Sequence, residues 1–91
     1  MAIGVIFNNL GQTQEQYDAA VEELNLAESL PEGWIFHAAG PTEDGWRVVE
    51  VWESQEAADA YFQGRLRQVL QNVGVSPGQP DTFTVYNVIA R

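Results

Sequence analysis

A strand that leads directly into a helix is the feature that most constrains the fold of this chain. Residues 46–53 have the length and the β-branched and aromatic content of a β-strand. Ser54 then caps a helix, and Glu56 lies in its first turn. One face of the strand carries Trp46, Val48, Glu50 and Trp52. A carboxylate among large apolar side chains is costly to bury without a partner, so this face borders either a polar pocket or solvent.

The other periodic segments complete an α+β fold. We predict strands over 2–7, 34–39, 46–53 and 82–90, and helices over 13–25 and 54–73. Thr13 and Gln16 have the spacing of a capping box, and the Asp44-Gly45 pair marks the turn of a hairpin. The order βαββαβ is that of a ferredoxin-like domain, a four-stranded antiparallel sheet with both helices on one face. Gly64 interrupts the second helix, and we expect it to allow another group to approach closely.

Both faces of the predicted sheet are largely apolar, although two helices cover only one of them. In the second strand, the alternate sets are Trp34, Phe36 and Ala38 on one side and Ile35, His37 and Ala39 on the other. An uncovered apolar face is rare on a monomer. We therefore expect a homodimer in which two sheets pack face to face.

The composition describes a small acidic domain without cysteine. Ninety-one residues make one domain, 1–91, and the 45% hydrophobic content is that of a folded protein. Thirteen acidic residues against four arginines give a net charge of −9, which argues against a nucleic acid or an anionic membrane as partner. We find neither a signal-peptide pattern nor the ~18–20 apolar residues of a membrane helix, and expect a cytoplasmic protein.

His37 and Glu50 are the candidate catalytic residues. If the hairpin turn spans 41–44, His37 falls roughly opposite Glu50 on one sheet face. A histidine gains and loses a proton near neutral pH, and a carboxylate can orient it as a general base. The alternative is a structural pair in which two buried polar groups satisfy each other. A register shift of one residue would separate them.

Five further residues are candidates for binding a ligand: Asn8, Trp46, Trp52, Tyr61 and Asn87. Aromatic walls suit a planar ligand, and amides donate and accept hydrogen bonds. Each also has a structural interpretation: the tryptophans and Tyr61 as core, Asn8 as a turn residue, and Asn87 as an edge-strand or interface residue. One histidine and no cysteine predict that no metal site is present.

The phrase Val-Glu-Val-Trp-Glu-Ser-Gln-Glu-Ala over residues 49–57 resembles the dimeric α/β-barrel superfamily, and most closely its antibiotic-biosynthesis-monooxygenase-like and stress-responsive members. The resemblance implies a ferredoxin-like protomer, a homodimer, and a pocket between sheet and helices. Members of that superfamily include cofactor-independent oxygenases of polycyclic phenols, haem-degrading enzymes, decarboxylases and isomerases. In the oxygenase branch, catalysis relies on a few polar groups in an aromatic pocket, and the resemblance puts Asn8, Trp52 and Tyr61 in that role.

The haem-degrading branch fits this sequence poorly. Asn8 matches an asparagine near the end of its first strand, and Tyr61 stands where that branch has a tryptophan. No histidine occurs in residues 54–73, so the haem ligand of that branch is missing.

Two interpretations of function therefore remain. The first is an enzyme without cofactor, an oxygenase or isomerase of a planar small molecule, in which His37 and Glu50 transfer protons. The second is a non-catalytic dimeric domain that binds a small aromatic ligand or serves only in assembly.

Overall fold

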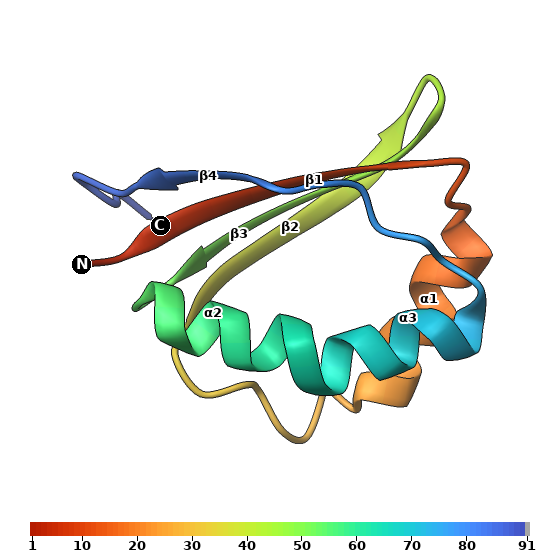
Figure 1. Ribbon diagram of the computed structural model, residues 1–91, viewed down its shortest axis with the longest axis horizontal. Coiled ribbons are helices and arrows are strands. Elements are labelled where there is room, and N and C mark those ends of the chain that lie inside the picture. The colour runs from red at the N-terminus through yellow and green to blue at the C-terminus, as the bar shows by residue number, and fades with distance from the viewer. Residues whose placement is uncertain (91) are drawn as a thin grey trace.

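Four antiparallel strands form a sheet, and the helices lie along one of its faces (Figure 1). The computed structural model describes residues 1–90. The strands are β1 (Ile3–Leu10), β2 (Trp34–Thr42), β3 (Gly45–Trp52) and β4 (Asp81–Thr84). The helices are α1 (Gln14–Leu24), α2 (Gln55–Tyr61), the π-helical turn η1 (Phe62–Leu66) and α3 (Arg67–Val73). The strand order is β2-β3-β1-β4, which confirms the ferredoxin-like α+β fold.

The helix starts form as their capping residues predict. The Thr13 hydroxyl oxygen accepts a hydrogen bond from the Gln16 amide at 3.2 Å, and the Gln16 side chain accepts one from the Thr13 amide at 3.0 Å. The Ser54 hydroxyl accepts from the Ala57 amide at 3.1 Å. These bonds satisfy backbone donors that the first turn of a helix leaves without partners. No helix within residues 1–90 is long and apolar enough to cross a membrane.

The second helical segment is continuous from 55 to 73 but contains the wide turn η1 at its centre. Such turns insert one extra residue into a helix and redirect the side chains around them. Gly64 lies in this turn, and a Cβ atom added there would meet nothing within 4 Å. The expectation that Gly64 allows a close approach is therefore wrong for residues 1–90.

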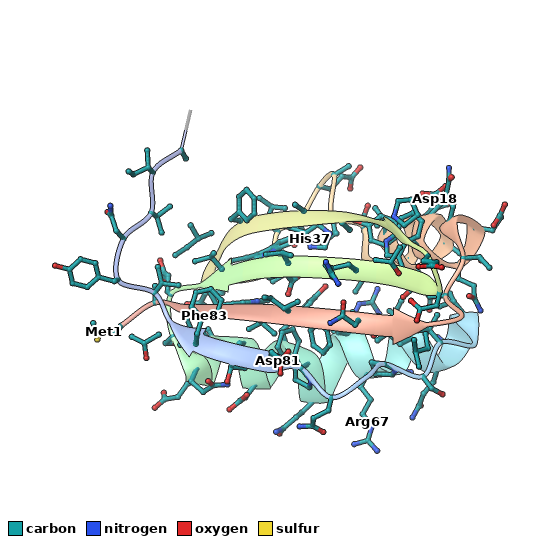
Figure 2. All side chains as sticks on the ribbon, turned by 90° about the horizontal axis from the view of Figure 1, so that it is seen from above. Met1, Asp18, His37, Arg67, Asp81 and Phe83 are labelled. Carbon is teal, nitrogen blue, oxygen red and sulfur yellow. The ribbon has the colours of Figure 1, made fainter. Side chains whose placement is uncertain are left out.

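The last strand is shorter than predicted. β4 ends at Thr84 instead of continuing to residue 90, because its partner β1 runs out: Thr84 pairs with Ile3, and the Val85 amide donates to the Ala2 carbonyl at 2.9 Å. Beyond this point the chain has no strand to pair with, and Figure 2 shows it turning away from the sheet. A segment with high strand propensity forms a strand only where a neighbouring strand is available to pair with it.

A bulge near the start of β2 changes which side chains share a face. Trp34 pairs with Trp52, but the next pair is Phe36 with Val51, so Ile35 is an extra residue. The bulge puts Trp34 on the face of His37, and it leaves Phe36 on the opposite face. The predicted grouping of Trp34 with Phe36 is therefore wrong, because strict alternation fails at a bulge.

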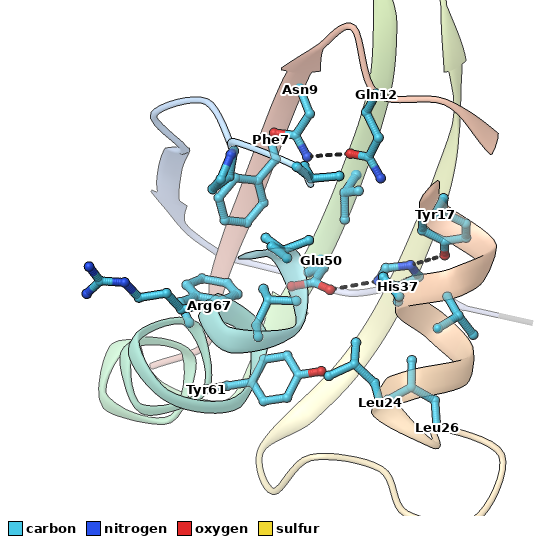
Figure 3. A pocket seen from close by; sticks show the side chains of 18 of the residues that line it. Phe7, Asn9, Gln12, Tyr17, Leu24, Leu26, His37, Glu50, Tyr61 and Arg67 are labelled. Atoms are coloured by element: carbon cyan, nitrogen blue, oxygen red, sulfur yellow. Dashed lines mark hydrogen bonds and ion pairs between the residues drawn. The ribbon is translucent and has the colours of Figure 1, made fainter. Parts of the chain in front are cut away.

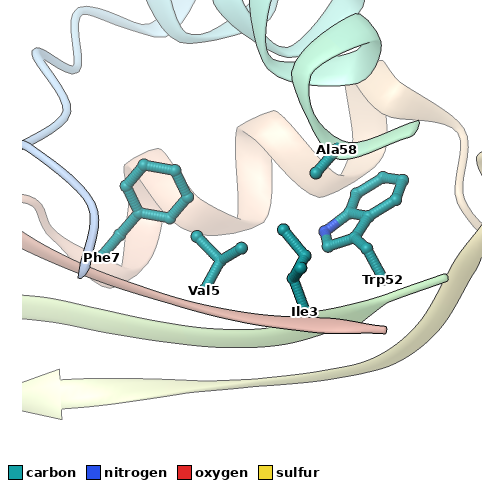
Figure 4. Packing of buried hydrophobic residues seen from close by; sticks show 5 residues of the cluster. All are labelled: Ile3, Val5, Phe7, Trp52 and Ala58. Atoms are coloured by element: carbon teal, nitrogen blue, oxygen red, sulfur yellow. The ribbon is translucent and has the colours of Figure 1, made fainter. Parts of the chain in front are cut away.

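The apolar core lies between the sheet and α2 (Figure 4). Its buried members are Ile3, Val5, Phe7, Trp52 and Ala58. Val5 and Trp52 are fully buried, and Phe7 packs edge-on against Phe62 with ring centres 5.1 Å apart. Because this core occupies one part of the inner face, the region between α1, α3 and the sheet is left for a pocket.

Two glycine substitutions should have opposite effects on stability. Gly64→Ala should raise the free energy of unfolding by about 0.5–1 kcal/mol, since alanine favours helix and the space is open. Gly33→Ala should lower it, because Gly33 has φ +85° and a new Cβ would lie 2.7 Å from the Cβ of Ala57. Urea denaturation of the two variants and the parent chain measures both. Destabilisation by Gly64→Ala would contradict the open turn.

Candidate functional site

A cavity of about 390 Å³ lies between the inner face of the sheet and helices α1, η1 and α3 (Figure 3). Its wall is mainly apolar and rich in aromatic side chains, which are Phe7, Tyr17, Trp34, Tyr61 and Phe62. The polar residues on the wall include Asn9, Gln12, His37 and Glu50. An apolar cavity with a few convergent polar groups is the usual form of a small-molecule site.

His37 and Glu50 meet in this cavity. They are direct partners across β2 and β3, and His37 Nδ1 lies 2.7 Å from Glu50 Oε2. The register that sequence analysis required is therefore the one that forms. On its other side, His37 Nε2 lies 2.6 Å from the Tyr17 hydroxyl. The three side chains form a continuous chain of hydrogen bonds, which we call the relay (Figure 3).

The Glu50 carboxylate is buried, with 4% of the residue exposed, and both of its oxygens have donors. Oε2 faces His37, and Oε1 accepts from the indole Nε1 of Trp52 at 3.0 Å. A buried carboxylate without such donors would cost several kcal/mol, or would take up a proton. Trp52 thus stabilises the carboxylate by a hydrogen bond but does not itself line the cavity.

The partners of His37 fix the direction of its hydrogen bonds. An ionised carboxylate only accepts, so Nδ1 carries the proton that points to Glu50. In the neutral ring Nε2 is then an acceptor, and the Tyr17 hydroxyl donates to it. His37 is poised to take a proton from Tyr17, and Glu50 is placed to stabilise the imidazolium that results.

Tyr17 is positioned by α1 and by ring packing. Its ring is nearly parallel to the His37 ring, with ring centres 6.0 Å apart and the hydroxyl between them, and it packs against Trp46 at 5.2 Å. Burial raises the pKa of the Tyr17 hydroxyl, and the charges of Glu50 and Asp18 raise it further. The resting group is therefore a phenol. In the sequence, Tyr17 is one member of an amphipathic stripe, and nothing in its spacing separates it from a core residue.

The candidate ligand-binding residues lie in different parts of the structure. Tyr61 lines the cavity, whereas Trp46 is buried behind Tyr17 and is not part of the wall. Asn8 points to the outer face of the sheet, where its Oδ1 accepts from Arg47 Nε at 2.7 Å. Asn87 is exposed in the segment after β4, because that strand ends early. The structure thus places Asn8 and Asn87 outside this pocket.

Two buried amides, Asn9 and Gln12, were not among the candidates from the sequence, and they are 5% and 7% exposed. Asn9 shares the inner face of β1 with Val5 and Phe7, so alternation from the core residues would have selected it over Asn8. Its Nδ2 donates to Gln12 Oε1 at 2.9 Å, and its Oδ1 accepts from the Gly78 amide at 3.0 Å. Gln12 lies outside any regular element, and its sequence context gives no signal.

Two further features of residues 1–90 concern hydrogen-bond donors without partners and the binding of metal ions. The indole nitrogens of Trp34 and Trp46 are buried and have no hydrogen-bond partner in residues 1–90. Within the same residues, no group of three His, Cys, Asp or Glu side chains is placed to hold a metal ion.

Tyr61 gives a prediction for alkaline pH. Burial, with a smaller effect of Glu50, raises its pKa to about 12. An unfolded tyrosine ionises near 10. Between these values the folded chain binds more protons than the unfolded chain, so the free energy of unfolding falls as the pH rises from about 10 to 12. Denaturant titrations across this range should show a smaller fall for Tyr61→Phe than for the parent chain.

The matched control is Tyr86→Phe, which changes a tyrosine that is 97% exposed. This variant should keep the pH dependence of the parent chain. Equal slopes for the two variants would refute the assignment of the alkaline effect to Tyr61.

No family model and no curated protein sequence matches this chain. Solved structures do match it over nearly its whole length. One is a candidate antibiotic biosynthesis monooxygenase from Chloroflexus aurantiacus, with 16% identity, a TM-score of 0.69, and coverage of 99% of this chain and 98% of that one. Another, from Deinococcus radiodurans with the same description, has 14% identity, a TM-score of 0.65, and coverage of 100% and 98%.

A third match is SnoaB, a cofactor-independent oxygenase from Streptomyces nogalater. Its identity is 12% and its TM-score 0.61, with coverage of 99% of this chain and 97% of that one. At such identities the likeness concerns the fold and does not extend to residue roles. This chain therefore has the same ferredoxin-like fold as these structures.

Proposed function

We propose that this protein is an enzyme without cofactor that removes a proton from a planar, weakly acidic small molecule, as an oxygenase or an isomerase. The observation that carries the proposal is the relay of Tyr17, His37 and Glu50, because all three side chains border one aromatic cavity. A hydrogen-bonded base, oriented by a carboxylate and open to a pocket, is the usual equipment for general base catalysis.

Tyr17 is the member of the relay that contacts the substrate. Both nitrogens of His37 are occupied, one by Glu50 and the other by Tyr17. His37 therefore has no free lone pair to offer a ligand. The Tyr17 oxygen donates its proton to His37 and keeps lone pairs that can accept from a substrate hydroxyl or an acidic C–H group.

The proton transfer is a concerted displacement of two protons along the relay. The substrate proton moves to the Tyr17 oxygen while the Tyr17 proton moves to His37 Nε2, and Glu50 stabilises the imidazolium. The raised pKa of Tyr17 favours this concerted path over a free tyrosinate. The substrate is left as an enolate or phenolate. Return of the proton at another atom completes an isomerisation. In an oxygenation, the carbanion carbon transfers two electrons to dioxygen as a C–O bond forms, and the resulting peroxide takes the proton back from the relay to become a hydroperoxide.

The shape and polarity of the cavity support a planar aromatic substrate. Flat rings from β1, β2, α1 and α2/η1 line the wall, and the volume of about 390 Å³ accommodates two or three fused rings. The Streptomyces nogalater protein is described as a cofactor-independent oxygenase, which supports the view that this fold can carry such chemistry without a bound cofactor.

We also propose that the protein acts as a homodimer through the outer face of the sheet, which Figure 2 views from above. The strand positions on this face include Phe36, Val49, Val51 and Phe83. Phe36 and Phe83 are 47% and 52% exposed. Arg47 and Asp81 are the only charged residues at the outward positions of the four strands, in a chain with thirteen acidic residues. An apolar face kept nearly free of charge suits a second copy of itself.

Variants of the relay test the catalytic proposal. Tetralone, a bicyclic ketone that forms an enolate, should exchange its α-hydrogens with D₂O faster in the presence of the protein. His37→Ala should lower this rate by about 10²-fold or more. Tyr17→Phe should have a similar effect, because it keeps the ring that contacts His37 and Trp46 and removes only the hydroxyl. Proton NMR measures the exchange, and oxygen uptake in parallel samples separates the oxygenase from the isomerase.

Tyr86→Phe serves as the control, since it deletes an exposed hydroxyl. A protein that binds tetralone but does not speed exchange, with relay variants that change only stability or affinity, would favour the non-catalytic binding domain.

The solution mass tests the dimer. Size-exclusion chromatography with light scattering at low micromolar concentration should give a dimer for the parent chain. Phe36→Glu should give a folded monomer, because it puts a charge within the proposed apolar interface. Leu30→Glu is the matched control: Leu30 is 68% exposed and lies in the α1–β2 connection. A folded monomer of the parent chain would overturn the dimer.

A further inference from the structure

We propose that Gln12 is a specificity-determining residue, whose side-chain NH₂ donates a hydrogen bond to a carbonyl oxygen of the ligand. This inference rests on the proposed function for the other end of the ligand, the acidic group that the relay deprotonates. It adds a second recognition point that the relay does not provide.

The orientation of the Asn9 amide is fixed by its two partners. The Gly78 backbone N–H can only donate, so the Asn9 atom 3.0 Å from it is the oxygen. The Asn9 nitrogen then donates to the side chain of Gln12 at 2.9 Å. Both polar atoms of the Asn9 side chain have a partner in the protein, and these contacts hold Gln12 and the segment after α3.

The orientation of Gln12 follows from that of Asn9. Since Asn9 donates to it, the Gln12 atom at this contact is the oxygen Oε1. The nitrogen Nε2 is left over, and no acceptor for it is found within residues 1–90. Gln12 lines the cavity, and only 7% of the residue is exposed. In Figure 3 the Asn9–Gln12 pair lies apart from the His37–Glu50 pair on the same cavity.

A donor on the wall of a cavity selects for a ligand with an acceptor at that point, because the bound ligand shields the donor from water. A ligand without one leaves the donor unsatisfied, at a cost of about 1–3 kcal/mol. Sites built around such a donor discriminate strongly between a ligand that carries the matching group and an analogue that lacks it. The relay, by contrast, accepts a proton. The cavity therefore calls for a planar molecule that bears an acidic hydroxyl and, elsewhere on the ring system, a carbonyl oxygen.

Two probes with one skeleton separate these requirements. Hydroxytetralone carries a phenolic hydroxyl on one ring and a ketone on the other, and tetrahydronaphthol has the same skeleton and hydroxyl without the ketone. The variant Gln12→Glu keeps an oxygen that accepts from Asn9 and replaces only the donor. Gln12→Leu removes both groups without adding a charge. Gln14→Leu changes an exposed glutamine two residues away and is the matched control.

Isothermal titration calorimetry with each probe gives the test. The parent chain and Gln14→Leu should bind hydroxytetralone about tenfold more tightly than tetrahydronaphthol, the value of one well-placed hydrogen bond. Gln12→Glu and Gln12→Leu should remove this preference, with little change in the affinity for tetrahydronaphthol. Circular dichroism confirms that both variants are folded.

Persistence of the tenfold preference in both folded Gln12 variants would overturn the inference, and so would equal affinities of the two probes for the parent chain. Failure of the proposed function gives a different result. In that case Tyr17→Phe would leave the exchange rate of tetralone unchanged, while the Gln12 variants would still abolish the preference for the ketone.

Discussion

The hydrogen bonds of the buried Glu50 carboxylate are the interactions on which the cavity side of the molecule depends. The carboxylate accepts hydrogen bonds from Trp52 on its own strand and from His37 on the neighbouring strand. His37 in turn holds Tyr17, so the bonds run from β3 through β2 to α1. The apolar core is concentrated under α2, and this polar chain, with the bond from Gln16 to the Val73 carbonyl, helps to attach α1 to the rest of the fold. Structure and proposed chemistry thus share the same three contacts.

A polar network in this position explains why the cavity can stay open. Apolar side chains alone would gain free energy by collapsing into a space of this size. The relay holds β2, β3 and α1 at separations set by hydrogen-bond geometry, and Asn9 holds the segment after α3 in the same way through Gly78. Each network uses a residue that also faces the cavity. Removal of either network should therefore affect the shape of the cavity as well as its chemistry.

Much of the fold could be predicted from the sequence because its signals are local. Capping residues mark the helix starts, and the hairpin brings His37 opposite Glu50. The predictions that are wrong concern features set by contacts between segments that are distant in the sequence. β4 stops because β1 offers no further partner, and the bulge at Ile35 breaks the alternation of β2. For the site, His37 and Glu50 were visible as polar residues on apolar strand faces. Tyr17 and Gln12 were not, since their roles exist only once α1 and the loop before it pack over the sheet.

The bulge in β2 also has a consequence for how chains of this fold can vary in length. Trp34 pairs with Trp52 and Phe36 pairs with Val51, so Ile35 is the residue of this stretch that has no partner on β3. Loss of Ile35 would make these two pairs consecutive and would leave both Trp34 and His37 on the inner face. A single-codon deletion here would thus remove a side chain that is 49% exposed and preserve the aromatic wall and the pairing of His37 with Glu50. The start of β2 can therefore change in length, and with it the surface of the sheet, without disturbing the pocket.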